Sequence, residues 1–388
     1  MLKYCIVTAS TWGATVFLFT LLSACAASDV TRPLEYSEIN KAEHVVFFRT
    51  SAWLDEETNN WHVPIHGWIY EPGDSTARIG VFSQALKLRY GLEAETPEAE
   101  RIFRQRANLL VSDNKRNKII IIRIGDSNFR LSESAPNGHF QSVLKLPAQT
   151  IGKIAKNNTL SFSAVTQPGE KRKFAGQVKL VQPDGLSIIS DIDDTVKISN
   201  VLDHRILFDN TFFKPFSAAP GMSQRYEYWS ERNISFHMVS SSPWYLYAPL
   251  EEFMDKDGFP WATFSLKMIR VKDESILNLF KKGTETKPLQ IEPILNRYPR
   301  RKFVLIGDSG EQDPEVYADL MKKHPNQIVS IFIRNITDAT PNDERFSKVF
   351  AGMDKNKWEL FTDPGGLIIA GGQSPHIAGT VSLVPLIP

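Results

Sequence analysis

Two aspartates separated by a single residue follow a short apolar run at 187–190. These are Asp191 and Asp193, and the run before them has the composition of a buried strand. Alternate residues of an extended chain project to the same side. Both carboxylates could therefore face one phosphate group, Asp191 as nucleophile and Asp193 as proton donor. The alternative is that these acids only form a turn or cap a helix.

A second apolar run, at 303–306, also ends in acid. Gly307 allows the backbone to approach a ligand closely or to turn sharply, and Asp308 offers the hard oxygen ligand that Mg²⁺ prefers. Asp313 could hold that ligand or a metal-bound water, or it could cap a helix that starts near Pro314. These two roles for Asp313 are compatible.

A hydroxyl and a cation lie between the two acidic segments. The apolar run 236–239 leads to Ser240, which could donate to a phosphoryl oxygen or could cap the next helix. Lys287 stands shortly before a helical stretch expected at 291–298, and its ammonium could neutralise a phosphoryl oxyanion. The alternative for a lone lysine is a solvated surface position.

These residues need a sheet that brings them to one edge. We expect strands ending at Asp191, Ser240, Asp308 and Arg334, with a further strand at 263–268 and a helix at 314–323. Segments long enough for helical crossovers separate the strands, so the predicted fold class is α/β, a doubly wound parallel sheet. Ligands bind at the carboxyl ends of the strands in such sheets.

The preceding part of the chain predicts a separate, mainly β, sandwich-like domain. Strands are expected at 61–70, 118–124, 128–131, 139–146 and 159–165, and a helical insertion at 77–92 and 97–109. His62 and His66 lie on one face of the first strand. Two imidazoles without a further ligand do not make a zinc site. The predicted domains are 25–182 (mainly β), 183–345 (catalytic) and 346–388 (a C-terminal extension rich in Gly and Pro).

The N-terminus predicts a bacterial lipoprotein signal over residues 1–24. Lys3 precedes an apolar run at 4–22, and the cysteine at the end of Leu22-Ser23-Ala24-Cys25 would be lipidated. The expected location is the bacterial cell envelope, lipid-anchored, at the outer membrane facing the periplasm. An uncleaved anchor and ordinary secretion are the alternatives. The only cysteines are Cys5 and Cys25, so the folded part has no disulfide.

Composition argues for an ordinary globular enzyme. The 388 residues are 42% hydrophobic and 23% charged, and 45 basic against 44 acidic residues give a net charge of +1. Such a balance creates no broad basic field, so nucleic acid is not an expected partner.

The motifs together resemble the haloacid dehalogenase superfamily. Segments 187–194, 240–247 and 305–317 are similar to the catalytic domain of the actin-patch-associated phosphatidate phosphatase family. The resemblance implies Asp191 as nucleophile, Asp193 as general acid and base, and Ser240 and Lys287 as phosphate ligands. It also implies Mg²⁺ as cofactor, with a metal site formed by Asp191, the backbone carbonyl of Asp193, Asp308 and Asp313. The modest inserts predict a small cap or none.

The expected function is Mg²⁺-dependent hydrolysis of a phosphomonoester through an aspartyl phosphate, with phosphatidate or another phosphomonoester as substrate and the membrane as partner through the lipid anchor. Two alternatives stay open, a catalytically silent phosphatidate-binding module and an envelope adaptor that works through its β domain. The aromatic residues Trp244, Tyr245 and Tyr247 either contact the substrate or bilayer, or pack a helix onto the sheet.

Overall fold

The computed structural model describes residues 35–73, 76–268 and 286–369. The predicted signal peptide, Cys25 and most of the Gly- and Pro-rich C-terminus lie outside the described residues. In the part that is described, no helix combines the length and the hydrophobicity that crossing a bilayer requires. Residues from Glu35 onward group into one compact unit.

A parallel sheet positions the predicted site. Within the described residues its six strands run in the order β12-β11-β10-β13-β14-β15. The chain therefore reverses direction across the sheet between β10 and β13, which is the switch point where open α/β sheets bind ligands. The strands are β10 (Leu186–Ser190), β11 (Ser235–Pro243), β12 (Ala262–Lys267), β13 (Lys302–Asp308), β14 (Ile328–Arg334) and β15 (Trp358–Phe361).

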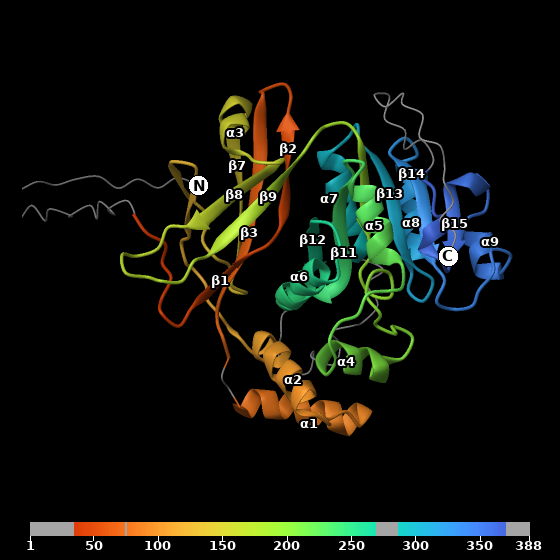
Figure 1. The fold of residues 1–388 in the computed structure, drawn as a ribbon, viewed down its shortest axis with the longest axis horizontal. Helices are drawn as coiled ribbons and strands as arrows, with labels where there is room; N and C mark the ends of the chain where they lie inside the picture. Colours follow the sequence, from red (N-terminus) through yellow and green to blue (C-terminus); the bar gives the residue numbers. More distant parts are fainter. Residues whose placement is uncertain (1–34, 74–75, 269–285, 370–388) are drawn as a thin grey trace, which may run out of the picture. The chain divides into compact units, whose positions relative to one another are not determined.

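Helices cover both faces of this sheet. Neighbouring residues of each strand point to opposite sides, so the apolar strands need a core on each face. Ile188 faces a core that includes residues of α4 (His204–Phe212), α5 (Met222–Ser230) and α6 (Tyr247–Lys256). Ile189 faces a second core with α7 (Thr286–Arg297), α8 (Asp313–Lys323) and α9 (Glu344–Val349). Figure 1 shows these helices around the parallel strands. The doubly wound prediction is confirmed.

Two local predictions for this sheet need correction. Helix α7 begins at Thr286, so Lys287 lies in its first turn and not before it. Strand β11 continues past Ser240 to Pro243, with an irregularity in its pairing with β12 between Val239 and Pro243. A break of this kind turns side chains toward a new direction, and it lies where the phosphate ligand was predicted.

The mainly β prediction for the preceding region is confirmed. Nine strands of the described residues form one sheet in which β3 pairs with β1, β2, β4 and β7, and only the β2–β9 pair is parallel. Residues of β3 and β5 share one core, so the sheet curls back on itself in a sandwich-like way. The strands are β1 (His44–Phe47), β2 (Thr50–Asp55), β3 (Asn60–Glu71), β4 (Asp113–Asn114), β5 (Ile121–Ile124), β6 (Ser127–Arg130), β7 (His139–Pro147), β8 (Thr159–Ala164) and β9 (Ala175–Val181).

The helical insertion also forms as predicted, as α1 (Thr76–Tyr90) and α2 (Pro97–Leu110). Thr96 caps α2 by accepting a hydrogen bond from the Ala99 N–H at 3.1 Å. The insertion packs on α4, where the rings of Phe103 and Phe213 stack at 5.0 Å. A short helix, α3 (Ala148–Ile154), follows β7.

The two sheets are joined by direct contacts. The Tyr298 hydroxyl at the end of α7 donates to Ser51 Oγ of β2 at 2.8 Å. The ring of Phe48 lies 4.3 Å from that of Trp244 and belongs to the same core as Ile188. The region before residue 182 therefore supplies part of the core of the parallel sheet.

Candidate active site

Asp191 and Asp308 lie on adjacent strands at the switch point of the parallel sheet. The Asp191 N–H donates to the Ile306 carbonyl at 2.8 Å, which fixes the end of β10 against β13. Both aspartates are buried, with Asp191 only 1% exposed. One oxygen from each of Asp191, Asp308 and Asp313 lies within 4.8 Å of the others. The structure thus brings together three of the predicted acids.

Lys287 projects from the first turn of α7 into this acidic group. Its Nζ lies 2.9 Å from Asp191 Oδ1 and 3.2 Å from Glu311 Oε2, and it also pairs with Asp313. The side chain is 3% exposed. The solvated alternative for Lys287 is therefore wrong, and the lysine stands beside the predicted nucleophile.

The acidic group carries more negative than positive charge. Burial raises the pKa of Asp191 and of Asp308 well above the ordinary range, although Lys287 opposes the rise. Burial also opposes the charged form of Lys287, but the carboxylates of Asp191 and Asp313 outweigh it and raise the lysine pKa well above its usual value. One ammonium cannot balance the surrounding carboxylates, so a further cation would be stabilised here.

The free oxygens of the group fit Mg²⁺. Asp191 Oδ2 and Asp308 Oδ2 are buried and have no hydrogen-bond partner among the residues that the structure describes. Buried carboxylate oxygens without partners are costly unless a cation or a donor meets them. Mg²⁺ takes oxygen ligands and is held by few protein carboxylates, which agrees with this donor set.

Asp193 makes a different set of contacts. Its Oδ1 accepts from Lys197 Nζ at 2.7 Å and Ser199 Oγ at 2.7 Å. Its Oδ2 accepts from Ser240 Oγ at 3.0 Å and Ser242 Oγ at 2.8 Å. Burial favours a raised pKa, but Lys197 and these hydrogen bonds prevail and lower the pKa of Asp193 to about 2. Asp193 is therefore a carboxylate before substrate binds.

Ser240 does not cap a helix. Its hydroxyl donates to Asp193 and accepts from the Ser242 N–H at 2.9 Å. The next helical turn, Trp244–Leu246, has Pro243 as its N-cap. The capping alternative for Ser240 is wrong, and the hydroxyl lies beside the predicted acid and base.

Helix α8 begins at Asp313 as predicted, but the Asp313 carboxylate is not its cap. The N-cap residue is Gln312, without a side-chain capping bond. Asp313 Oδ2 instead accepts from the Asp308 N–H at 3.1 Å. Asp313 therefore ties α8 to the end of β13.

The turn-forming acid of the first motif is Asp194. Its φ is 53°, in the left-handed region. Its Oδ1 accepts from the backbone N–H groups of Ser199 and Asn200 at 2.8 and 3.0 Å, and its Oδ2 accepts from that of Val201 at 2.6 Å. The turn alternative thus describes Asp194, while Asp191 and Asp193 point into the site.

Four residues at the site were not predicted from the sequence, namely Lys197, Ser199, Ser242 and Glu311. Signals for two of them exist in the sequence. Ser242 follows Ser240 by two residues, the spacing of one face of a strand, and Lys197 follows Asp193 by four. Lys197 required knowledge of the turn, since a spacing of four brings side chains together only in a compact backbone.

The aromatic residues after Ser242 pack the interior. Trp244, Tyr245 and Tyr247 are 7%, 9% and 1% exposed. Tyr247 donates to Glu251 at 2.6 Å and its hydroxyl accepts from the Arg49 N–H at 3.0 Å. The packing alternative is confirmed for all three.

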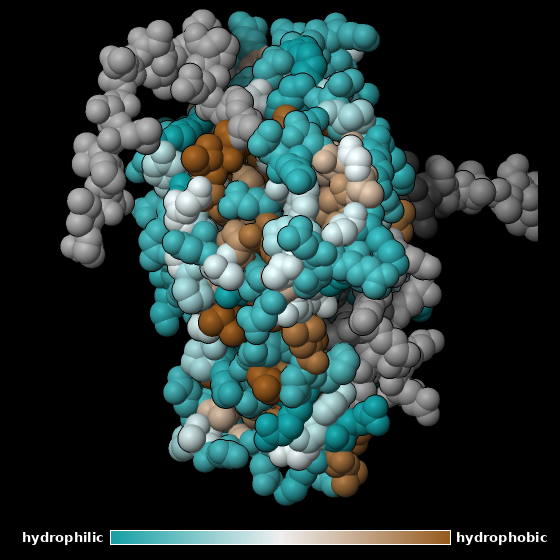
Figure 2. Space-filling view, turned by 90° about the vertical axis from the view of Figure 1, so that its right-hand side faces the viewer, coloured by the Kyte–Doolittle hydropathy of each residue, from teal (hydrophilic) through white to brown (hydrophobic). Residues whose placement is uncertain are grey.

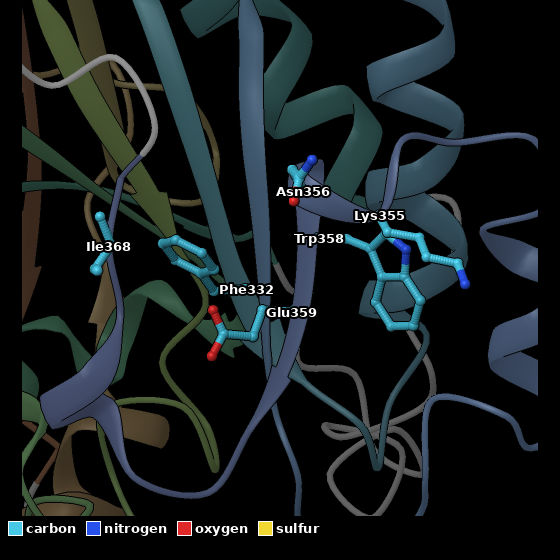
Figure 3. A pocket seen from close by; sticks show the side chains of 6 residues that line it. All are labelled: Phe332, Lys355, Asn356, Trp358, Glu359 and Ile368. Carbon is cyan, nitrogen blue, oxygen red and sulfur yellow. The ribbon is translucent and has the colours of Figure 1, made fainter.

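A cavity of about 350 Å³ lies elsewhere, at the edge strand β15. Figure 3 shows that its side chains lie on both sides of β15 and do not converge on one point. On the face shown in Figure 2, hydrophobic residues form small separate patches among hydrophilic ones. The cavity residues are Phe332, Lys355, Asn356, Trp358, Glu359 and Ile368.

Comparison with known proteins supports the family resemblance. Residues 186–335 match the model of the phosphatidate phosphatase APP1 catalytic domain. Phosphatidate phosphatase APP1 of Saccharomyces cerevisiae is 33% identical over 172 residues, which cover 42% of this chain and 29% of that protein. An uncharacterised protein of Schizosaccharomyces pombe is 28% identical over 256 residues, which cover 62% of this chain and 41% of that protein.

This chain thus spans less than half the length of either relative. The fission-yeast alignment is longer than the matched segment 186–335, so the similarity extends outside that segment. Among solved structures, the D,D-heptose 1,7-bisphosphate phosphatase from B. bronchiseptica, complexed with magnesium and phosphate, matches with 14% identity and a TM-score of 0.27. That match covers 46% of this chain and 93% of that one.

Proposed function

We propose that this protein is a Mg²⁺-dependent phosphomonoesterase that forms an aspartyl phosphate on Asp191. One observation carries the proposal. Asp191 stands at the switch point of the sheet, 2.9 Å from the buried Lys287 ammonium and within a group of three carboxylates that leaves oxygens free for a cation. The match to the phosphatidate phosphatase APP1 catalytic domain supports the same reaction class.

In the proposed first step, Asp191 attacks the phosphorus atom and the bond to the leaving oxygen breaks. Lys287 and Ser240 bind phosphoryl oxygens, because phosphoryl transfer depends on positioning and on the stabilisation of charge more than on covalent chemistry. Mg²⁺, held by Asp191, Asp308 and Asp313 with the backbone carbonyl of Asp193, would supply the positive charge that lets a carboxylate approach a phosphate.

Asp193 handles the proton in both steps of the proposal. Because it is ionised at rest, it must first receive a proton, which the monoanion of a phosphomonoester can bring. It then gives that proton to the leaving oxygen. In the second step the Asp193 carboxylate takes a proton from the water that opens the aspartyl phosphate.

The direct test is phosphate release by Asp191→Asn. We expect no turnover of 4-nitrophenyl phosphate with Mg²⁺, while the far-UV circular dichroism spectrum and the unfolding temperature stay close to those of the wild type. Asp319→Asn is the matched control, because this aspartate of α8 is 73% exposed. Turnover at the wild-type rate by Asp191→Asn would exclude the nucleophile.

The substrate class extends the proposal. We infer phosphatidate or another phosphomonoester of the bacterial envelope, reached by a protein anchored through lipidated Cys25 at the outer membrane. A panel of lipid and soluble phosphomonoesters with Mg²⁺ or chelator tests the substrate. Mass spectrometry of the mature N-terminus tests the anchor, and an unmodified Cys25 or an intact Met1 would exclude it.

The same panel separates the alternatives. Binding of phosphatidate vesicles with no phosphate release from any ester would favour a silent lipid-binding module. Two features of the site argue against a catalytically silent module. A protein that only binds lipid needs neither a nucleophile next to Lys287 nor a proton carrier such as Asp193. The adaptor alternative predicts a protein partner for the β domain.

A further inference from the structure

Lys197 is a buried lysine that the proposed reaction does not use. It is 2% exposed, and its Nζ lies 2.7 Å from Asp193 Oδ1 and 2.6 Å from Ser199 Oγ. A buried ammonium is costly unless it is paired and hydrogen-bonded. The contacts of Lys197 therefore hold it against one specific oxygen of Asp193.

The two oxygens of Asp193 have separate partners. Oδ1 accepts from Lys197 and Ser199, which follow it in the chain, whereas Oδ2 accepts from the hydroxyls of Ser240 and Ser242 on β11. Ser240 is the predicted phosphate ligand, so Oδ2 is the oxygen on the substrate side. Lys197 thus holds the carboxylate by the oxygen that does not contact Ser240 and Ser242.

The backbone and an aromatic ring fix Lys197 in turn. Its N–H donates to the Ile192 carbonyl at 3.0 Å, and its own carbonyl accepts from the Asp194 N–H at 2.7 Å. The Nζ lies 4.8 Å from the centre of the Phe216 ring, a cation–π contact. Both ends of the lysine are therefore restrained.

A second cation, Arg106 of the helical insertion, contacts the Phe216 ring. Arg106 of α2 lies 3.8 Å from the centre of the Phe216 ring and donates to the carbonyls of Thr211 at 2.5 Å and Lys214 at 2.9 Å. These bonds fix the segment that carries Phe216. The region before the parallel sheet thus contacts the support of Lys197.

We propose that Lys197 is a positioning residue that orients Asp193 so that Oδ2 meets the leaving-group oxygen. This inference rests on the proposed function of Asp193. Without Lys197, Ser199 is the one side-chain donor left to Oδ1 among the residues with described positions, and the carboxylate can rotate away from the leaving oxygen. Protonation of poor leaving groups would then suffer most, because good leaving groups depart with little help from an acid.

The test compares two esters that differ in their need for that proton. For Lys197→Met we expect kcat/KM, which reports the first step alone, to fall by about 10-fold or more on glycerol 2-phosphate, an alkyl ester, as a part of the roughly 10²–10⁴-fold that proton transfer contributes. The kcat/KM on 4-nitrophenyl phosphate should fall much less, whereas the second step is common to both esters. Asp193→Asn should show the same selectivity, and Lys197→Met should add little to the loss on the alkyl ester in the double variant.

Lys214→Met is the matched control. Lys214 lies in the same segment as Phe216, but its side chain is 54% exposed and pairs with Asp209. We expect it to leave both rates unchanged. If Lys197→Met does not fold, Phe216→Leu loosens the same lysine and should show a smaller loss with the same selectivity for the alkyl ester.

An equal loss on both esters, or independent losses in the double variant, would overturn the role of Lys197 while leaving the phosphatase proposal standing. Absence of phosphate release by the wild type from every ester would instead overturn both. Unfolding temperatures of each variant with and without Mg²⁺ show whether the fold and the metal response are retained.

Discussion

Gly307 lies so close to Asp313 that a Cβ on the glycine would stand 2.2 Å from Asp313 Oδ2 and 2.6 Å from Asp313 Cβ. The absence of a side chain at this position lets the Asp313 carboxylate reach the Asp308 N–H. Any larger residue must displace Asp313, and with it one corner of the three-acid group.

Gly307→Ala should therefore lower the free energy of unfolding by about 1–3 kcal/mol, the usual result of overpacking. It should also remove the stabilisation by Mg²⁺. Urea unfolding with and without Mg²⁺ measures both effects. Gly80→Ala is the control, since an added Cβ at this position of α1 meets no atom of the described part of the chain within 4 Å. Gly80→Ala should raise the free energy of unfolding by up to about 1 kcal/mol, because alanine has a higher helix propensity than glycine. Equal behaviour of the two variants would contradict the prediction.

Mg²⁺ should raise the unfolding temperature of the wild type, because a ligand that binds only the folded state stabilises it. At a concentration of about 100 times the dissociation constant, the gain is about 2.7 kcal/mol. Asp308→Asn should lose most of this gain, since Asp308 Oδ2 is a buried oxygen that has no hydrogen-bond partner within the described ranges. Differential scanning fluorimetry over a Mg²⁺ titration measures it. The exposed Asp319→Asn should retain the wild-type response, and full retention by Asp308→Asn would exclude this metal site.

Phe48→Ala should lower the free energy of unfolding by about 3–5 kcal/mol, as expected for a buried aromatic residue. Phe48 is 1% exposed and contacts Trp244 and Tyr247 in the segment after Ser240. Equilibrium urea unfolding measures the loss. Leu88→Ala is the matched control, because Leu88 is 77% exposed and its loss should change stability by about 0.5 kcal/mol or less. A small effect at Phe48 would mean that the β domain contributes little to the shared core.

His237 should make the protein less stable in acid. Burial lowers the pKa of His237 from 6.5 to about 3. The pKa of His237 is lower in the folded state than in the unfolded state. Its contribution to the free energy of unfolding is therefore complete above pH 6.5 and is lost as the pH falls toward 3. Over that window it steepens the decline by up to about 1.4 kcal/mol per pH unit.

His237→Phe should have a shallower pH dependence of the free energy of unfolding between pH 6.5 and 4. At pH 7 it should lose about 1 kcal/mol, because Thr263 Oγ1 loses its hydrogen bond to the His237 ring. Urea unfolding across this range measures the slope. His204→Gln, on the exposed start of α4, should keep the wild-type slope. A slope unchanged by His237→Phe would show that another group governs the acid response.

The parallel sheet could be predicted because its signals are local. Apolar runs such as 187–190 and 303–306 mark strands buried on both faces, and each leads to an aspartate that enters the site. The convergence of Asp191 and Asp308 follows from parallel strands at a switch point. The meeting of the two aspartates can therefore be predicted once the order of the strands is known.

The missed features depend on contacts between distant segments. Strand β9 mixes Gly176, Gln177 and Lys179 with apolar residues, and its pairing with β2 and β8 decides its conformation. The turn at Asp194 decides that Lys197 meets Asp193, and the spacing of four residues does not predict the contact without that turn. The helix start at Thr286 was missed because Pro288 and Pro293 obscure the pattern, although proline is tolerated in a first turn.

The three backbone bonds of the Asp194 carboxylate have a consequence for ligand affinity. They order the loop from Ser199 to Val201 when the chain folds, before any phosphate arrives. Binding then needs to freeze little backbone motion, so less of the interaction energy with the ligand is spent on conformational entropy. A phosphate ester bound at the proposed site would therefore meet a loop whose backbone is already ordered, even if the ester makes few contacts beyond its phosphoryl group.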